Sequence, residues 1–271
     1  FNAVDIIVVG RFSGSQALAA VGSTTALINV FTNLFIGISL GANVLAARFY
    51  AAGKDREMSE TVHTSITLAL ISGIMMAVIG VLLAKWALEI MGTPDDVIGQ
   101  SALYMRIYFM GMPFFMLYNY GAAILRAIGD TKRPLIFLII SGIANAALNM
   151  TLVILFHMGV AGVAIGTIIS QLISCVLVLT CLYRSEGSYQ LRFSKLRMKK
   201  EYLKQIFQVG IPAGVQSTVI NFSNALLQSS VNSFGSTAMA GYTAANNILG
   251  FLYASINAVT QACMSFTSQN Y

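Results

Sequence analysis

Charged side chains are scarce in this sequence. Asp, Glu, Lys and Arg together make up 10% of its 271 residues, while hydrophobic residues make up 56%. Soluble domains carry about 25% charged residues, and a mean hydropathy of +0.74 means that the chain holds more apolar side chains than one soluble core can bury. The composition excludes an ordinary soluble domain and predicts an all-α membrane protein built as a polytopic helical bundle.

Cysteine and histidine are also rare. Cys175, Cys181 and Cys263 all lie in apolar stretches without a CxxC pair, which supports neither a disulfide framework nor a zinc site and predicts small core residues. His63 and His157 have no second His or Cys at ligand spacing. An intramembrane enzyme would need a catalytic pair of side chains, and the sequence offers no such pair. We therefore expect neither an enzyme nor a cofactor.

Basic residues are few but unevenly placed. The net charge is +6, and 13 of the 16 Lys and Arg lie in alternate loops between apolar runs. This pattern fits membrane topology better than a nucleic-acid-binding surface, and the positive-inside rule makes these loops cytoplasmic in a protein of the cell membrane. A helix needs about 20 mostly apolar residues to cross a bilayer. Such runs predict spans at 23–50, 61–84, 97–127, 134–156, 160–184, 205–233 and 238–270, after part of a helix at 1–12.

The longest connection, residues 185–204, is also the most basic. Leu196 and Leu203 fall near one helical face and Lys199 and Lys200 on others, which predicts an amphipathic helix on the inner leaflet. The expected domains are a six-helix lobe with a truncated first helix, the basic linker and the first two helices of a second lobe: residues 1–184, 185–204 and 205–271.

The chain contains a weak internal repeat. The stretch "GSQALAAVGSTTALINV" from Gly14 aligns without gaps with "GSTAMAGYTAANNILGF" from Gly235, an offset of 221 residues. The offset covers six predicted helices, an even number, so both copies are expected to enter the membrane in the same direction. Such parallel repeats are typical of transporters built from two six-helix halves.

Six motifs in order make the chain similar to the multidrug and toxic compound extrusion (MATE) family: "VDIIVVGRFSGSQALAAVG", "AARFYAAGKDRE", "AAILRAIGDTKRPL", "NAALNMTLVI", "GVAGVAIGTIISQ" and "GIPAGVQS". The resemblance covers essentially the whole chain. It implies twelve helices in two lobes with alternating access, of which this chain is a fragment. It further implies a monomeric antiporter that exports small organic cations in exchange for H⁺ or Na⁺.

One carboxylate, Asp5, lies within an otherwise apolar predicted helix. Ionisable residues inside a membrane are costly and mark functional sites by default. Polar side chains recur one turn apart in two later spans, at Asn145 and Asn149 and at Thr167 and Gln171, so each pair shares a helix face. Taken alone, the amides fit interhelical hydrogen bonding equally well. The family resemblance implies that Asp5, Asn145, Asn149 and Thr167 form a cation or proton site.

Two departures from the family pattern bear on the branch and on the coupling ion. Relatives often have a second aspartate where this chain has Asn149, so the expectation of a Na⁺ site is weakened and H⁺ is favoured. The helix after "GIP" lacks the glutamate of the NorM-like branch and carries neutral polar residues instead, as in a DinF-like branch. Polar and aromatic residues give the candidate cavity-lining set Gln171, Asn221, Asn224 and Tyr118.

A flippase for lipid-linked saccharides, from the same superfamily, is the alternative function. It would favour a strongly cationic central cavity able to hold phosphate, to which only Arg106 could contribute. Arg106 itself needs a partner or a water-filled crevice. Two glycine pairs, Gly37 with Gly41 and Gly162 with Gly166, are interpreted as helix-packing contacts between small residues.

Overall fold

The computed structural model describes residues 2–90, 93, 95–232 and 236–270, and within these ranges every regular element is helical. The side chains of 2–3, 15–16, 23, 26, 95–96, 220–221, 224–232, 236–248, 251 and 254 lie outside the description. The elements in chain order are α1 (Asn2–Phe12), α2 (Ser15–Ala51), α3 (Asp55–Ile90), α4 (Asp95–Met110), α5 (Met112–Ala127), α6 (Lys132–Met150), a π-helical turn (Thr151–Leu155), α7 (Gly159–Arg184), a 3-10 turn (Phe193–Lys195), α8 (Lys200–Asn232) and α9 (Ser236–Asn270).

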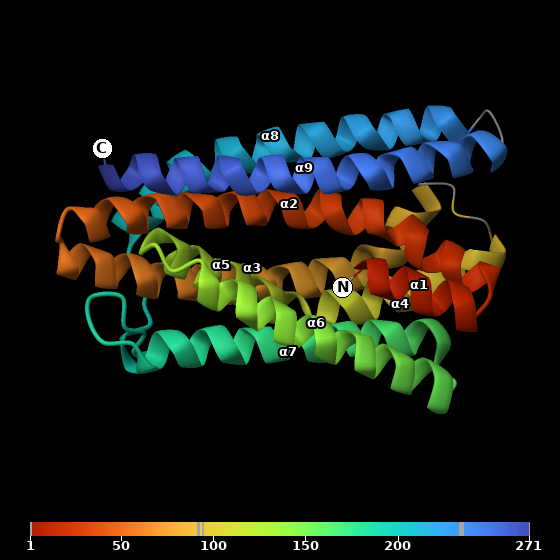
Figure 1. Ribbon diagram of the computed structural model, residues 1–271, viewed down its shortest axis with the longest axis horizontal. Helices are drawn as coiled ribbons and strands as arrows, with labels where there is room; N and C mark the ends of the chain where they lie inside the picture. Colours follow the sequence, from red (N-terminus) through yellow and green to blue (C-terminus); the bar gives the residue numbers. More distant parts are fainter. Residues whose placement is uncertain (1, 91–92, 94, 233–235, 271) are drawn as a thin grey trace.

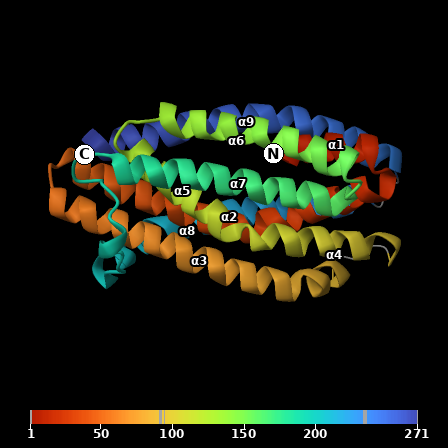
Figure 2. The same cartoon turned by 90° about the horizontal axis from the view of Figure 1, so that it is seen from below.

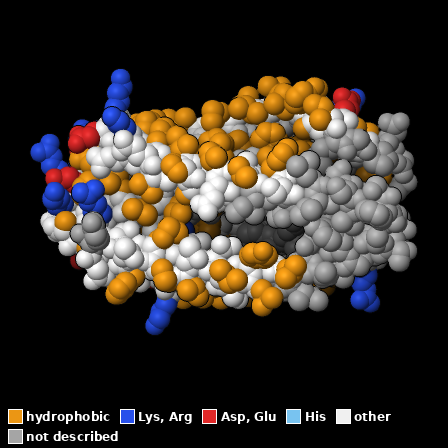
Figure 3. All heavy atoms as spheres, turned by 90° about the horizontal axis from the view of Figure 1, so that it is seen from above, with side chains coloured by type: hydrophobic (Ala, Val, Ile, Leu, Met, Phe, Trp, Pro, Cys, Tyr) orange, Lys and Arg blue, Asp and Glu red, His pale blue; other side chains and the backbone are white. Residues whose placement is uncertain are grey.

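The helices lie roughly along one direction as an elongated bundle (Figure 1). Four helices in the described ranges are long and apolar enough to cross a membrane: Ala17–Ala51, Asp55–Ile90, Lys132–Leu155 and Gly159–Arg184. Apolar side chains cover much of the surface between the two ends, and the visible Lys and Arg side chains gather mainly at one end (Figure 3). This surface is that of a multi-pass membrane protein. That the basic end faces the cytoplasm stays a prediction.

One predicted span needs correction. The run 97–127 is not a single helix, because α4 ends at Met110 and α5 starts at Met112. Pro113 lies in the first turn of α5, where its missing N–H leaves no helical bond unmade. An added Cβ on Gly73 of α3 would lie 2.5 Å from the Cα of Pro113, so the break also lets α3 and α5 approach closely.

The orientation of the long helices agrees with the parallel repeat. The two copies of the repeat begin at Gly14 and Gly235 and continue into α2 and α9. These two helices run in the same direction and end near the same end of the bundle (Figure 1). There, Ser265 of α9 donates its hydroxyl to Oδ1 of Asn43 at 3.1 Å, and the amide of Gln269 donates to the Ala127 carbonyl at 2.7 Å. These bonds hold the end of α9 against α2 and α5.

The contact between α2 and α8 depends on glycine. An added Cβ on Gly37 would lie 2.2 Å from the Cα of Gly214, and one on Gly41 would lie 2.2 Å from the carbonyl oxygen of Ile206. In the other direction, a Cβ on Gly210 would lie 2.6 Å from the Cα of Ile38. The two backbones are therefore in direct contact, as predicted for this glycine pair.

The connection between α7 and α8 is not the separate amphipathic helix predicted within residues 185–204. It contains only the 3-10 turn Phe193–Lys195, and the α-helix that follows starts at Lys200 and continues as α8. The reason is that the connection is fixed to α3 by specific bonds, so its polar groups are satisfied without helix formation.

Glu60 of α3 is the centre of this attachment. Only 8% of Glu60 is exposed, and its carboxylate accepts hydrogen bonds from the guanidinium of Arg197 and pairs with Lys199, whose Nζ lies 2.8 Å from Oε1. Nearby, the backbone N–H of Arg192 donates to Nε2 of His63 at 3.1 Å. The connection is thus held on α3 up to the residue before α8 begins.

The cysteine prediction is correct for one residue. Cys175 is buried, as expected for a small core residue, whereas Cys181 is half-buried and Cys263 is exposed. All three are free thiols.

We predict that Gly37→Ala lowers the thermal stability of the full-length protein. The added methyl group meets the backbone of α8, which cannot turn aside as a side chain can, so overpacking costs about 1–3 kcal/mol. Gly22→Ala is the matched control on the same helix, because a Cβ there has no neighbour within 4 Å. Thermal unfolding of the purified protein measures both, and equal midpoints would contradict direct backbone contact.

Glu60→Gln should loosen the connection between α7 and α8. Because the side chains of Arg197 and Lys199 are 60% and 32% exposed, water compensates part of the loss, and we expect a cost of about 1 kcal/mol. This corresponds to a roughly fivefold faster tryptic cleavage within residues 185–199, measured on the full-length protein. Glu89→Gln is the control, since it removes only an exposed pair with Lys85. Unchanged cleavage of the Glu60 variant would refute the attachment.

Candidate functional site

Asp5 is the carboxylate around which the candidate site is built. It lies on α1, which contacts α2, α6 and α7, and α6 and α7 run side by side (Figure 2). Asp5 is 1% exposed. Its Oδ1 accepts a hydrogen bond from Nδ2 of Asn149 at 2.6 Å, and its Oδ2 accepts from the hydroxyls of Thr167 at 3.0 Å and Tyr104 at 3.4 Å. Side chains from three helices, α4, α6 and α7, thus donate to one carboxylate on a fourth.

Asn145 completes the network through Thr167 and Asn149. Its Nδ2 donates to the hydroxyl oxygen of Thr167 at 3.3 Å, and its Oδ1 accepts from Nδ2 of Asn149 at 3.4 Å. The four residues predicted as the site, Asp5, Asn145, Asn149 and Thr167, are all buried. The fold brings them together in one connected set of hydrogen bonds, and their role in transport stays a prediction.

The local structure of α6 and α7 explains how the amides reach Asp5. Asn145 and Asn149 are one helical turn apart and so share a face of α6, which passes into the π-helical turn directly afterwards. On α7, an added Cβ at Gly166 would lie 2.3 Å from Oδ1 of Asn149. Gly166 is therefore more than a helix-packing residue, because its missing side chain leaves the space that the Asn149 amide occupies.

Among the described residues, all side chains that donate hydrogen bonds to the Asp5 carboxylate are neutral. Within the described ranges, no Lys, Arg or His pairs with Asp5, and the donors to it are an amide and two hydroxyls. Desolvating a carboxylate costs several kcal/mol, while a hydrogen bond to a charged group contributes about 1.5–3 kcal/mol. The desolvation cost and the contribution of these hydrogen bonds are of similar size, so the ionised carboxylate can stay buried. Because the donors are neutral, a proton or a cation can neutralise Asp5 without leaving a buried counter-charge behind.

Two buried acceptors near the network have no donor in the described part of the chain. They are Oδ1 of Asn149 and Oε1 of Gln171. Gln171 lies one turn after Thr167 on α7, and a Cβ on Gly111 would lie 2.8 Å from its Oε1, which places it beside the break between α4 and α5. Buried oxygens without a donor are the groups that a cation or a water molecule would satisfy.

The other candidate residues lie elsewhere or outside the description. Tyr118 is buried and donates its hydroxyl to the Pro134 carbonyl at 3.0 Å, so it ties α5 to α6. The side chains of Asn221 and Asn224 lie outside the described residues. Arg106 is exposed on α4 and has no ion-pair partner among the described residues.

Tyr104 is the site residue that the sequence did not reveal. On pattern alone it is better interpreted as one of several packing aromatics. A signal exists in retrospect, because the hydroxyl side chains of Ser101, Tyr104 and Tyr108 are spaced so that they share one face of α4. Nothing in the sequence, however, says that this face meets α1.

Comparisons with known proteins agree with this fold. Residues 1–151 match the family model described as MatE. "Probable multidrug resistance protein YoeA" of Bacillus subtilis (strain 168) is 33% identical over 258 residues, which cover 92% of this chain and 55% of that protein. "Multidrug export protein MepA" of Staphylococcus saprophyticus is 24% identical over 243 residues, or 89% of this chain and 54% of that protein.

A solved structure has the same fold. The structure described as "Crystal structure of MATE in the bent conformation" superposes with a TM-score of 0.87 at 22% sequence identity, over 99% of this chain and 59% of that chain. The chain studied spans little more than half the length of these relatives.

We predict that Gly166→Ala displaces the Asn149 amide from Asp5. The methyl group would occupy the position of Oδ1, so either the amide turns or α6 and α7 separate, at a cost of about 1–3 kcal/mol. Gly99→Ala on α4 is the control, since a Cβ there has no neighbour within 4 Å. The thermal midpoint of the full-length protein should fall for Gly166→Ala only. A midpoint unchanged in both variants would mean that Asn149 is not held in this position.

Proposed function

Since the chain belongs to the MatE family, whose members are transporters and not enzymes, we propose that it forms part of a secondary antiporter in the cell membrane. The antiporter exports small organic cations, including drugs, in exchange for H⁺ or, as the second choice, Na⁺. Relatives named for multidrug resistance and multidrug export support the drug substrates. The coupling mechanism rests on the site itself.

The observation that carries the proposal is a buried carboxylate with neutral partners. Such a group changes its net charge when it takes up one proton or one cation, and the hydrogen bonds around it must then change as well. Ionised Asp5 accepts from Asn149, Thr167 and Tyr104. In this state the negative charge favours an organic cation nearby.

Protonation reverses one of these hydrogen bonds. A protonated carboxyl group has a donor of its own, and the acceptor best placed for it is Asn149, whose Oδ1 has no donor in the described structure. To accept, the amide must turn, and its Nδ2 then leaves both Asp5 and the Oδ1 of Asn145. The contact between α1 and α6 differs between the two protonation states, and such a difference is what a shift between conformations requires.

The same residues bear on the choice between H⁺ and Na⁺. Sodium would need several oxygen ligands, and Asp5, Thr167, Asn145 and a turned Asn149 would offer them. Only one of these ligands is a carboxylate, because Asn149 stands where relatives often have a second aspartate. A Na⁺ ion would thus depend mainly on neutral oxygens, whereas a proton needs only the carboxyl group of Asp5 itself, which is why we favour H⁺.

The lobes and their orientation belong to the same proposal. Residues 1–184 form the first lobe and residues 205–271 begin the second, joined by the linker 185–204, with the basic loops in the cytoplasm. The glycine contact between α2 and α8 is then a contact between lobes. Asp5 lies in the first lobe, so a change in its hydrogen bonds acts on the helices that meet the second.

The flippase alternative is disfavoured by the position of Arg106. A flippase needs positive charge where a lipid phosphate would be held. Arg106 is exposed on α4 with Leu103 and Met110, which are 48% and 62% exposed, whereas Tyr104 on the buried face of the same helix reaches Asp5. Arg106 therefore lies on a different face of α4 from the polar site.

We predict that Asp5→Asn abolishes ion-driven efflux by the full-length protein while leaving folding and membrane insertion intact. Asparagine keeps the shape of the side chain but cannot take up a proton. Asn145→Ala and Thr167→Ala should weaken efflux by less, because Thr167 is one of three donors to Asp5 and Asn145 bonds only Thr167 and Asn149, at 3.3 and 3.4 Å, so the carboxyl group that takes up the proton is kept in both variants. The measurement is drug efflux from proteoliposomes with an imposed pH gradient, repeated with an imposed Na⁺ gradient.

Asp55→Asn serves as the control for the loss of one carboxylate, since Asp55 is exposed at the start of α3. It should transport as the unmodified protein does. If Asp5→Asn transports at the unmodified rate with the same pH dependence, Asp5 is a structural residue and the mechanism is wrong.

A further inference from the structure

The connection between α7 and α8 has a second attachment to α3 besides Glu60. Its acceptor is His63, a side chain of α3 that is 2% exposed. Nδ1 of the ring lies 2.6 Å from the Ser59 carbonyl oxygen, and Nε2 lies 3.1 Å from the backbone nitrogen of Arg192. A carbonyl oxygen can only accept and a backbone N–H can only donate. The neutral ring therefore carries its hydrogen on Nδ1, and Nε2 is the acceptor.

The residues on both sides of Arg192 are held by α7. The backbone N–H of Leu191, which is fully buried, donates to the Leu182 carbonyl at 3.0 Å. The ring of Phe193 stacks on that of Tyr183, with centroids 5.8 Å apart. The bond from Arg192 to the imidazole therefore joins the end of α7 to α3.

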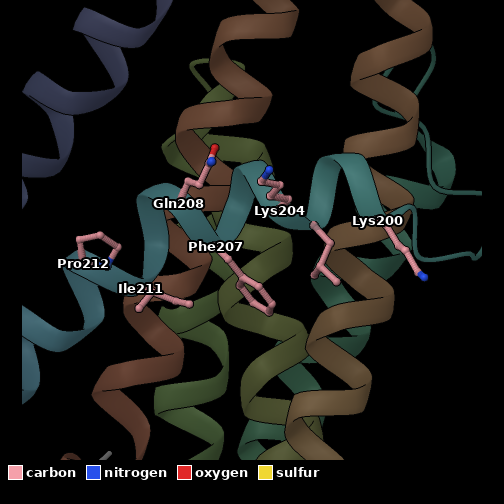
Figure 4. A pocket seen from close by; sticks show the side chains of 7 residues that line it. Lys200, Lys204, Phe207, Gln208, Ile211 and Pro212 are labelled. Carbon is pink, nitrogen blue, oxygen red and sulfur yellow. The ribbon is translucent and has the colours of Figure 1, made fainter.

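The far end of the connection is held in a different way. There Arg197 and Lys199 pair with Glu60, and α8 begins directly afterwards at Lys200 (Figure 4). These ion pairs do not include His63, so the two attachments can be released separately. Both are made between residues of the described chain, so neither depends on a free surface.

A proton on Nε2 removes the bond to Arg192. The imidazolium ring is a donor at both nitrogens, so its Nε2–H would face the backbone N–H that it accepts from when neutral. Histidine is the side chain whose ordinary charge change falls in the physiological pH range. His63 lines a cleft of about 500 Å³ whose walls are α3 and the connection, and this cleft is the route of water to the ring.

The charges around His63 also oppose an imidazolium in the attached form. More cations than carboxylates line the cleft or lie beside it: Arg56, Lys195, Arg197 and Lys199 against Asp55 and Glu60. The carboxylate of Glu60 is already paired. The helices packed against α3 near this end add Arg48 and Tyr50 of α2, Tyr120 and Arg126 of α5, and Lys200, Glu201, Tyr202 and Lys204 of α8.

We propose that His63 is a pH-operated latch between α3 and the end of α7. The attached form needs the neutral ring as its acceptor, so the attachment is present at high pH and is lost as the pH falls. When the solution at the basic end of the bundle becomes acidic, residues 191–193 separate from α3 and stay with α7. The ends of α3 and α7 can then shift against each other while Glu60 still holds the start of α8. This latch is separate from Asp5 and does not depend on which ion drives transport.

Electron paramagnetic resonance of the full-length protein tests the latch. A nitroxide is attached to Ser194→Cys after all other cysteines are replaced by alanine, because Ser194 lies on the connection and lines the cleft. The immobile and mobile components of the spectrum measure the attached and detached forms. Between about pH 8 and about pH 5 the ratio of mobile to immobile label should rise, by up to about tenfold for each pH unit below the midpoint, because the proton binds to the detached form.

His63→Gln offers a side-chain oxygen to the Arg192 N–H but cannot take up a proton, so the label should stay immobile at both pH values. His157→Asn is the matched control, because His157 is the other histidine of the sequence and is exposed in the turn between α6 and α7. Asparagine tolerates the φ of 52° found there, and the pH response should be kept. A label at Met198→Cys, between the two residues that pair with Glu60, should stay immobile throughout.

Nitrogen-15 NMR of the protein without spin label, with isotope in its histidines, gives a second measurement. At about pH 8 the ring of His63 should carry hydrogen on Nδ1 only, and its protonation should have the same midpoint as the mobility of the label at position 194. The proposal is overturned by a mobility that does not change with pH, by the same pH response in His63→Gln, by hydrogen on Nε2 at high pH, or by two different midpoints.

Discussion

A buried carboxylate that has neutral hydrogen-bond partners is the constraint on which this structure depends. Asp5 is 1% exposed and is held by an amide and two hydroxyls from α4, α6 and α7. A salt bridge in this position would fix the charge of the site permanently. Neutral donors stabilise the ionised form enough to keep it buried, yet they allow a proton or a cation to replace that charge. The same hydrogen bonds that hold four helices together are thus those that the proposed coupling would change.

The remainder of the fold shows how such a local change can act at a distance. Backbones in direct contact at Gly37 and Gly214 leave no room for gradual adjustment, and tightly packed contacts of this kind tend to have discrete arrangements. The attachment of residues 185–199 to Glu60 fixes the start of α8 relative to α3. A movement of α8 would therefore begin at Lys200. In the proposed two-lobe arrangement, the second lobe would therefore move about the start of α8 and would not be free to move along the whole length of residues 185–199.

The sequence predicted which polar residues gather around Asp5 better than it predicted how they are arranged. Asn145, Asn149 and Thr167 were predictable because helical spacing and family motifs both point to them. Tyr104 was not, because its contact with Asp5 joins residues 99 positions apart and depends on how α4 packs. The linker helix was predicted wrongly because Glu60 lies inside a helix whose pattern gives no hint of two basic partners in residues 197 and 199. The role of Gly166 could not be predicted from the sequence either, because it depends on the position of the Asn149 amide in the folded protein.

Counting the protons exchanged when a drug binds tests the central claim most directly. Titration calorimetry of the full-length protein with an organic cation, in two buffers of different ionisation enthalpy, gives this number without a membrane gradient. We predict that the unmodified protein releases about one proton per drug molecule bound at a pH at which Asp5 is protonated, or shows Na⁺-dependent drug affinity if sodium is the coupling ion. The Asp5→Asn variant should show neither effect. The same proton release or the same Na⁺ dependence in both proteins would contradict the assignment of Asp5 as the coupling residue.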